Sequence, residues 1–106
     1  MAWTYLLMAG ACEIAATTLF RYTDGFSRLW PSVVCIAVGS LSFYLLNRAL
    51  SGVSLGTAYA VWTGIGAAGT AIIGIAAYHE PASGMRMVCL AMLICGIVGL
   101  KVFAPD

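Results

Sequence analysis

The sequence predicts an all-α membrane protein with four transmembrane helices, and three observations lead to this prediction. Of the 106 residues, 62% are hydrophobic and only 8% are charged, whereas soluble domains have about 45–50% apolar and about 25% charged residues. A soluble fold this short has a large surface for its volume, which five basic and four acidic side chains cannot cover. The charges also divide the chain into four apolar segments, each close to the ~20 residues that span a hydrocarbon core.

These segments should be helices, because a spanning segment in lipid must satisfy its own backbone hydrogen bonds. The first segment holds one charge, Glu13, and no Lys or Arg precedes Arg21. We therefore expect a retained span rather than a signal peptide, followed by a turn at Asp24 and Gly25. The predicted protein is a single domain that crosses the inner (plasma) membrane several times. Its helices cover residues 2–20, 30–50, 55–78 and 85–103 of the domain, which spans 1–106.

Composition and spacing exclude several classes of function. The net charge is only +1, so the chain lacks the basic field that nucleic-acid binding requires. The cysteines are scattered along apolar stretches rather than paired as CxxC, and they are best explained as small packing residues. With no nucleophile–base pair, metal constellation or cofactor motif, we expect no enzyme activity, no metal and no cofactor. The four cysteines are Cys12, Cys35, Cys89 and Cys95.

Glu13 is the main candidate functional residue, because a carboxylate within a membrane span is costly and indicates a functional site. Its neighbours at three and four residues along the helix are small: Ala9, Gly10, Ala16 and Thr17. Burial disfavours the charged form of a carboxyl group, so Glu13 can hold a proton near neutral pH and release it when a cation arrives. We place Gly10 and Thr17 with it in the site. The alternative is a protonated glutamate that merely hydrogen-bonds a neighbouring helix.

Two aromatic residues in the third segment extend this candidate site. Tyr59 and Trp62 are three residues apart and share a helix face, and aromatic faces attract cations by about 0.5 to 2 kcal/mol. In membrane helices such residues also serve as interface anchors, but a position in the middle of the span favours the site. Ser42 is a further candidate, although a serine in such a helix often hydrogen-bonds its own backbone.

Small residues in the third and fourth segments indicate bending or close packing. Gly64 and Gly66 are candidate hinge residues for alternating access, and close helix packing is the alternative explanation. Four short helices can hardly enclose a polar pathway, so a dimer is the smallest working unit that we expect. A strip in the fourth segment suits this association and consists of Ala91, Cys95, Gly96 and Gly99.

Two motifs link the chain to a known family. They are GFSRLWPS at 25–32 and GTAYAVWTGIG at 56–66, in addition to Glu13 midway along the first span. With the length and the number of spans, they make the chain resemble the small multidrug resistance transporters over essentially its whole length. The resemblance implies a dimer whose subunits insert in opposite orientations. The weak bias of positive charges, three on one membrane side against two on the other, agrees with such dual insertion.

The resemblance also implies roles for individual residues. Glu13 would bind proton and cation alternately, Tyr59 and Trp62 would line the cavity, Ser42 would lie close by, and Gly10 would keep space open. Thr63 and the run GIGA at 64–67 look like the guanidinium-exporter branch, as do YLL, HEP and GLK at 44–46, 79–81 and 99–101.

The first segment looks different, because guanidinium exporters typically carry a Trp three residues after the glutamate, where this chain has Ala16. The run ATTL at 16–19 resembles the quaternary-ammonium branch instead. Replacing an indole by a methyl group removes a hydrogen-bond donor near Glu13 and leaves room, so selectivity can loosen. A second explanation is that the chain is one half of a paired heterodimer whose partner supplies the Trp.

We therefore expect a proton-coupled antiporter of small organic cations, with guanidinium-type substrates favoured over quaternary ammonium ones. In this hypothesis a proton displaces the cation at Glu13 while a rocking dimer exposes the site to alternate sides of the membrane. The rival hypothesis is a non-transporting membrane subunit, such as a helper or half of a lipid-carrier flippase. The set of Glu13, Tyr59 and Trp62 counts against this rival, because a helper has no evident need of it.

Overall fold

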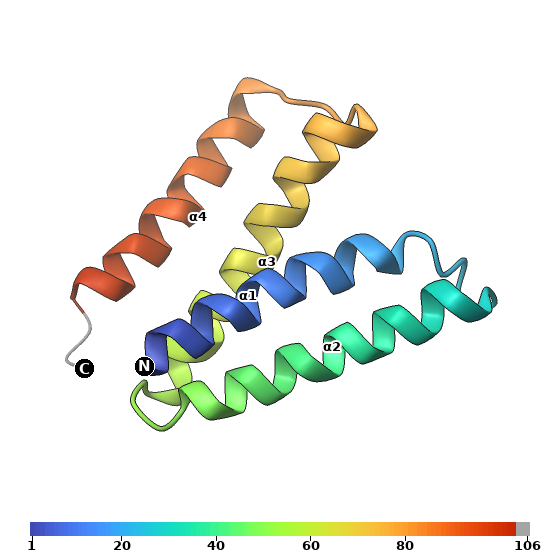
Figure 1. The fold of residues 1–106 in the computed structure, drawn as a ribbon. Helices are drawn as coiled ribbons and strands as arrows, with labels where there is room; N and C mark the ends of the chain where they lie inside the picture. Colours follow the sequence, from blue (N-terminus) through green and yellow to red (C-terminus); the bar gives the residue numbers. More distant parts are fainter. Residues whose placement is uncertain (104–106) are drawn as a thin grey trace.

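The fold is taken from a computed structural model that describes residues 1–103, and it consists of four helices (Figure 1). They are α1 (Ala2–Phe20), α2 (Leu29–Ala49), α3 (Leu55–Tyr78) and α4 (Gly84–Val102). Each helix boundary lies within one residue of the position expected from the sequence, and no strand occurs among residues 1–103. All four helices are long and apolar enough to cross a membrane, which confirms the predicted fold class.

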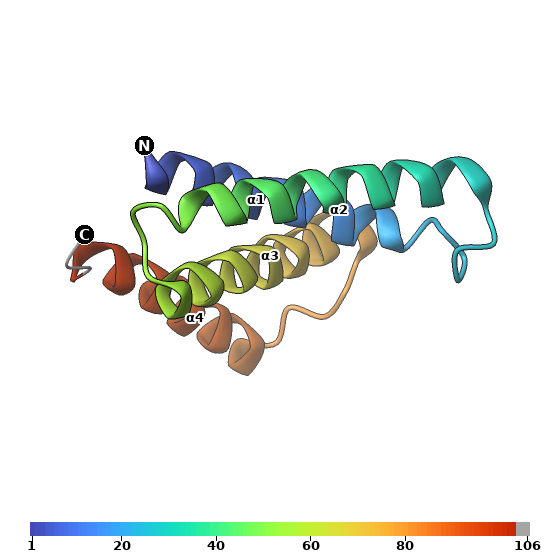
Figure 2. The same cartoon turned by 90° about the horizontal axis from the view of Figure 1, so that it is seen from below.

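The helices form two thin layers. Figure 2 shows α1 and α2 in one layer and α3 and α4 in the other, and the molecule measures 43 × 35 × 16 Å. The layers meet mainly where α1 crosses α3, and α4 packs mainly on α3, with Nζ of Lys101 4.9 Å from the ring centroid of Trp3 in α1. A methyl group built on Gly10 would lie 2.7 Å from Cγ2 of Ile65, so the absence of a side chain at Gly10 allows the two helices to approach this closely.

The core lies at one end of the molecule, near the N-terminus and the α2–α3 connection. There the first half of α1 packs against the second half of α2 and the first half of α3. Beyond the crossing, α1 and α3 diverge toward their C-terminal ends (Figure 1). Glu13 lies in α1 directly against Gly66 of α3. The buried core residues are Leu6, Ala9, Leu45, Leu46, Ala49, Val53, Ala58, Val61 and Trp62.

The outer faces of the helices are apolar and exposed, as expected for surfaces that contact lipid. The helix α4 is the extreme case, because none of its residues is buried. Met92, for example, is 68% exposed and Val98 is 55% exposed. Soluble monomers rarely carry apolar patches of this extent, so these faces must be covered by lipid or by another protein surface.

Candidate functional site

Glu13 lies between two cavities, one on each side of α1. The larger has a volume of about 420 Å³ and lies between α1, α3 and the α3–α4 connection. The smaller has a volume of about 310 Å³ and lies between α1 and α2. Both are lined by Glu13, Thr17 and Trp62, so the carboxyl group can be reached from either side.

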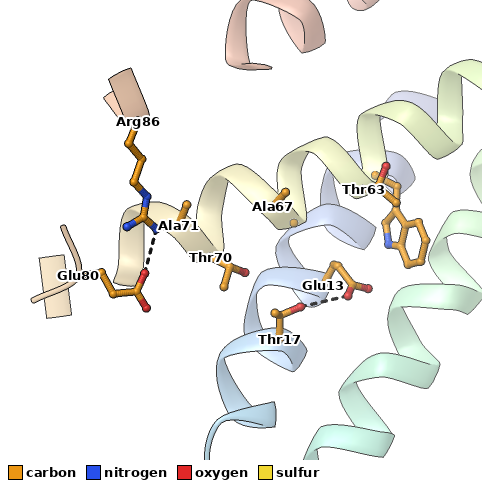
Figure 3. A pocket seen from close by; sticks show the side chains of 10 residues that line it. Glu13, Thr17, Thr63, Ala67, Thr70, Ala71, Glu80 and Arg86 are labelled. Atoms are coloured by element: carbon orange, nitrogen blue, oxygen red, sulfur yellow. Dashed lines mark hydrogen bonds and ion pairs between the residues drawn. The ribbon is translucent and has the colours of Figure 1, made fainter. Parts of the chain in front are cut away.

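The immediate contacts of Glu13 are few. The hydroxyl group of Thr17, one helical turn further along α1, donates a hydrogen bond of 3.1 Å to Oε1 (Figure 3). The carboxyl group forms no ion pair within residues 1–103, where the single salt bridge joins Arg86 and Glu80. A methyl group built on Gly66 of α3 would lie 2.6 Å from Cγ of Glu13. The glutamate side chain therefore occupies space that any side chain at residue 66 would take.

A chain of hydrogen bonds holds the aromatic wall of the site. The indole N–H of Trp62 donates to Oγ of Ser42 at 2.8 Å, and this hydroxyl donates to the carbonyl of Ala9 at 2.7 Å. Ser42 is fully buried, and Trp62 is only 6% exposed. The bonds connect α3, α2 and α1 in the turn preceding Glu13. Ser42 thus bridges helices rather than bonding its own backbone, which was the alternative expected from the sequence.

Two further aromatic rings lie against Trp62. The ring centroid of Phe43 is 5.1 Å from that of Trp62, and the centroid of Tyr59 is 5.6 Å away. Phe43 lines the smaller cavity. Tyr59 lines neither of these two cavities and is 56% exposed on the outer side of Trp62. Its expected place in the site stays a prediction that depends on what covers this face.

The structure separates the remaining small residues that the sequence grouped with the site. Gly10 packs against Ile65 at the helix crossing rather than lining a cavity, and Gly64 faces Ile97 of α4. Gly66 does touch Glu13, within an α3 that is helical throughout, and the hinge stays a prediction. The expected dimer strip of α4 is largely exposed, and methyl groups built on Gly96 and Gly99 would meet open space.

Sequence reasoning missed several residues that line the cavities. From the sequence, no role in the site was expected for Glu80, in the α3–α4 connection, or for Arg86, in the first turn of α4, yet both line the same cavity as Glu13. Thr70 also lines it, and its buried hydroxyl group has no hydrogen-bond partner among the described residues. Its spacing from Gly66 is the one signal in the sequence, because residues four apart on a helix share a face. Phe43 carried no such signal, because it resembles any lipid-facing residue.

This arrangement suits single positive charges. A carboxyl group without an ion pair, beside an aromatic wall, can hold one proton or one cation at a time. Groups of His, Cys, Asp and Glu that could hold a metal ion do not occur in the described part of the chain. The fold and the site thus define a four-helix membrane protein with a carboxyl group shared between two cavities.

Comparison with known proteins identifies the family. A family model described as Small Multidrug Resistance protein matches residues 1–93. The "Guanidinium exporter" of Proteus vulgaris is 48% identical over 101 residues, which cover 95% of this chain and 97% of that protein. The protein of the same name in Escherichia coli K12 is also 48% identical, with 95% and 96% coverage. That of Salmonella typhimurium is 46% identical over 104 residues, with 98% and 99% coverage.

The chain therefore belongs to the small multidrug resistance family, as its sequence motifs indicated. It is a multi-pass protein of the inner membrane and a transport protein rather than an enzyme.

Proposed function

We propose that this chain is a proton-coupled antiporter that exports small organic cations, with guanidinium-type substrates favoured. The observation that carries the proposal is the position of Glu13, which lies between two cavities inside a membrane span and forms no ion pair with any other residue of 1–103. Relatives named guanidinium exporters, at up to 48% identity over 95% of the chain, support the substrate class.

The mechanism is competition at one carboxyl group. In its charged form Glu13 binds a cation beside Trp62, and Thr17 donates a hydrogen bond to the carboxylate. In its protonated form it no longer attracts a cation, so a proton that arrives from one side displaces the substrate. Coupling requires that the empty, charged carboxylate does not readily cross between the two accessible states.

The working unit in this proposal contains a second subunit. A helix α4 without buried residues, and a molecule only 16 Å thin, leave the site open on faces that a second copy can cover. The family resemblance implies that the two copies insert in opposite orientations, which would make the outward and inward states equivalent. A paired subunit of the same family is the alternative partner.

One observation favours a second substrate class. Ala16 lines the smaller cavity next to Glu13 and is 7% exposed. A methyl group at this position leaves room that the expected tryptophan of guanidinium exporters would fill. Bulkier quaternary ammonium ions are therefore the second candidate substrate.

The test measures transport in proteoliposomes that contain only this chain, with guanidinium and tetrapropylammonium as substrates. A proton gradient should drive uptake of one of them, and the apparent affinity should fall by up to about tenfold per pH unit toward acid, as one proton replaces one cation. Glu13→Gln should abolish coupled transport. Asp24→Asn, which removes an exposed carboxyl group in the α1–α2 connection, is the matched control and should leave transport unchanged.

Proton-driven transport that persists in Glu13→Gln would refute the mechanism. If the wild-type chain transports neither cation but does so when a related subunit is coexpressed, the chain is half of a heterodimer. If no coexpressed subunit restores transport of either cation, a non-transporting accessory subunit is favoured.

A further inference from the structure

A second carboxyl group faces the same cavity as Glu13. Glu80 lies in the connection after α3, at the opposite end of the 420 Å³ cavity, and Figure 3 shows both groups along one side of α3. Glu80 also lines a smaller cavity of about 130 Å³ that shares Thr17 and Thr70 with the larger one. The cavity therefore has one carboxyl group within the membrane spans and another at its end near the α3–α4 connection. We call this end the mouth of the cavity.

The local backbone turns Glu80 back onto α3. His79 ends the helix in a left-handed conformation with φ of 58°, and the amide of Glu80 then donates to the carbonyl of Gly74 at 3.1 Å. The carboxyl group lies directly on Gly74, where any Cβ atom would collide with it. A left-handed residue followed by such a bond is a usual way to end a helix. Here it fixes an acidic side chain over the cavity.

Glu80 already holds a guanidinium group. Nη2 of Arg86 donates to its Oε1 at 2.9 Å, and Nη1 of the same side chain donates to the carbonyl of Pro81 at 2.8 Å. The side chains of Arg86 and Glu80 are 32% and 40% exposed. Ion pairs of this exposure are weak, because water competes for both partners. A free guanidinium ion presents the same planar N–H donors as Arg86 and can compete for the same carboxylate.

Thr70 lies between the two carboxyl groups. Gly66, Thr70 and Gly74 are spaced by four residues and line one face of α3. The rise from the first to the last is about 12 Å. Thr70 lines both cavities that reach Glu80. Its hydroxyl oxygen is buried and has no hydrogen-bond partner within residues 1–103. Thr70 therefore places an unpaired hydroxyl group, covered in this structure, beside the path between the two carboxyl groups.

The remaining charge at the mouth is positive. Cζ of Arg21 lies 3.8 Å from the ring centroid of Tyr78, and both residues line the 130 Å³ cavity beside Glu80. With Glu80 neutralised by Arg86, the charge of Arg21 is left to repel an incoming cation. A cation is therefore held most strongly at this end of the cavity when it replaces Arg86 on Glu80.

We infer that Glu80 is an outer binding site for guanidinium-type cations, and that Arg86 is its tethered occupant, displaced when a substrate cation binds on the way to Glu13. The inference rests on the proposed function for the direction of travel. It assigns the connection between α3 and α4 a role in selectivity, because a quaternary ammonium ion has no N–H donors with which to replace Arg86. In this inference, Arg86 competes with the substrate cation for the carboxylate of Glu80.

The first test compares KM values for guanidinium transport in Glu80→Gln and Arg86→Gln. Loss of the carboxylate should raise KM by about threefold, and loss of the competing guanidinium should lower it by a similar factor, as expected for one partly exposed charge contact. Changes in the same direction would mean that the ion pair only holds the connection in place, and would overturn the inference. Arg28→Gln is the matched control, since this exposed arginine in the α1–α2 connection should leave KM unchanged. If Arg28→Gln lowers KM as much as Arg86→Gln does, the effect is one of general surface charge and the inference is overturned.

The second test does not depend on transport. The chain with ¹⁵N-labelled arginine side chains, in lipid bicelles, is titrated with phenylguanidinium and followed by NMR. The guanidinium signals of Arg86 should shift while those of Arg28 stay, the shift should persist in Glu13→Gln, and Glu80→Gln should abolish it. An unshifted Arg86, or an equal shift with tetrapropylammonium, would overturn the inference. Failed proton-driven transport with a positive titration would instead count against the proposed function alone.

Discussion

The substitution Gly66→Ala tests whether the geometry around Glu13 matters for binding. The added methyl group would lie 2.6 Å from Cγ of Glu13, about 1 Å closer than an ordinary carbon–carbon contact of ~3.5–4.0 Å. Either the glutamate side chain or the helix must move by that amount. The overpacking costs about 1–3 kcal/mol, and the better helix propensity of alanine offsets about 1 kcal/mol of it. The net loss of stability is therefore small, at most about 2 kcal/mol.

The effect on cation binding should be much larger than the effect on stability, because a displacement of about 1 Å can cost a factor of ~100 where a charged group must be positioned. We expect Gly66→Ala to fold and to lose at least about tenfold in cation affinity. Isothermal titration calorimetry in detergent micelles gives the affinity, and thermal unfolding followed by circular dichroism gives the stability.

The matched control is Gly56→Ala in the same helix, where a methyl group meets nothing within 4 Å. It should gain stability and keep its affinity. An affinity of Gly66→Ala within twofold of the wild type would show that Glu13 does not act from its position against α3.

Two further predictions concern the walls of the cavities. Ser42→Ala leaves the buried N–H of Trp62 unpaired and should destabilise the chain by about 1–2 kcal/mol, measured by thermal unfolding. In a chain that already carries Trp62→Phe, Ser42→Ala should cost much less stability, because no indole N–H is left unpaired. If the stability losses of the two substitutions simply add in the double variant, the hydrogen bond between Trp62 and Ser42 is contradicted. Ala16→Trp should fill part of the 310 Å³ cavity and shift the transport preference toward guanidinium over tetrapropylammonium by about tenfold. An unchanged preference would exclude this wall as the selectivity element.

The sequence was sufficient to predict the helices, and it was sufficient to select Glu13 as the central candidate for the site. Hydrophobic length determines the four spans because lipid leaves the backbone no alternative to helix, and Glu13 is conspicuous as the single charge in its span. Ser42 and Trp62 could be nominated as site residues, but not paired. Their hydrogen bond depends on how α2 and α3 rotate against each other, and hydrophobicity around the helices is too uniform to fix that rotation.

The mouth of the cavity could not be predicted for a different reason. A polar connection between two spans is normally explained by exposure to water, and Glu80 and Arg86 fit that explanation by composition. Their position depends on the left-handed conformation of His79 and on the missing side chain of Gly74. A histidine after a helix and a glycine within one each occur for several structural reasons, so neither residue alone predicts this arrangement. Only the three-dimensional structure brings them together over the cavity.

The inferred outer binding site at Glu80 also gives the ion pair with Arg86 a function in selectivity. A cavity with Glu13 alone would attract any small cation from water, including Na⁺ and K⁺, which are abundant and carry no N–H donors. At the mouth, Arg86 already occupies the carboxylate of Glu80. An entering ion must therefore offer hydrogen bonds as good as those of Arg86 in order to bind there. Guanidinium meets that requirement and alkali ions do not. Freeing Glu80 by Arg86→Gln should therefore lower KM and, at the same time, make guanidinium binding more sensitive to competition by K⁺.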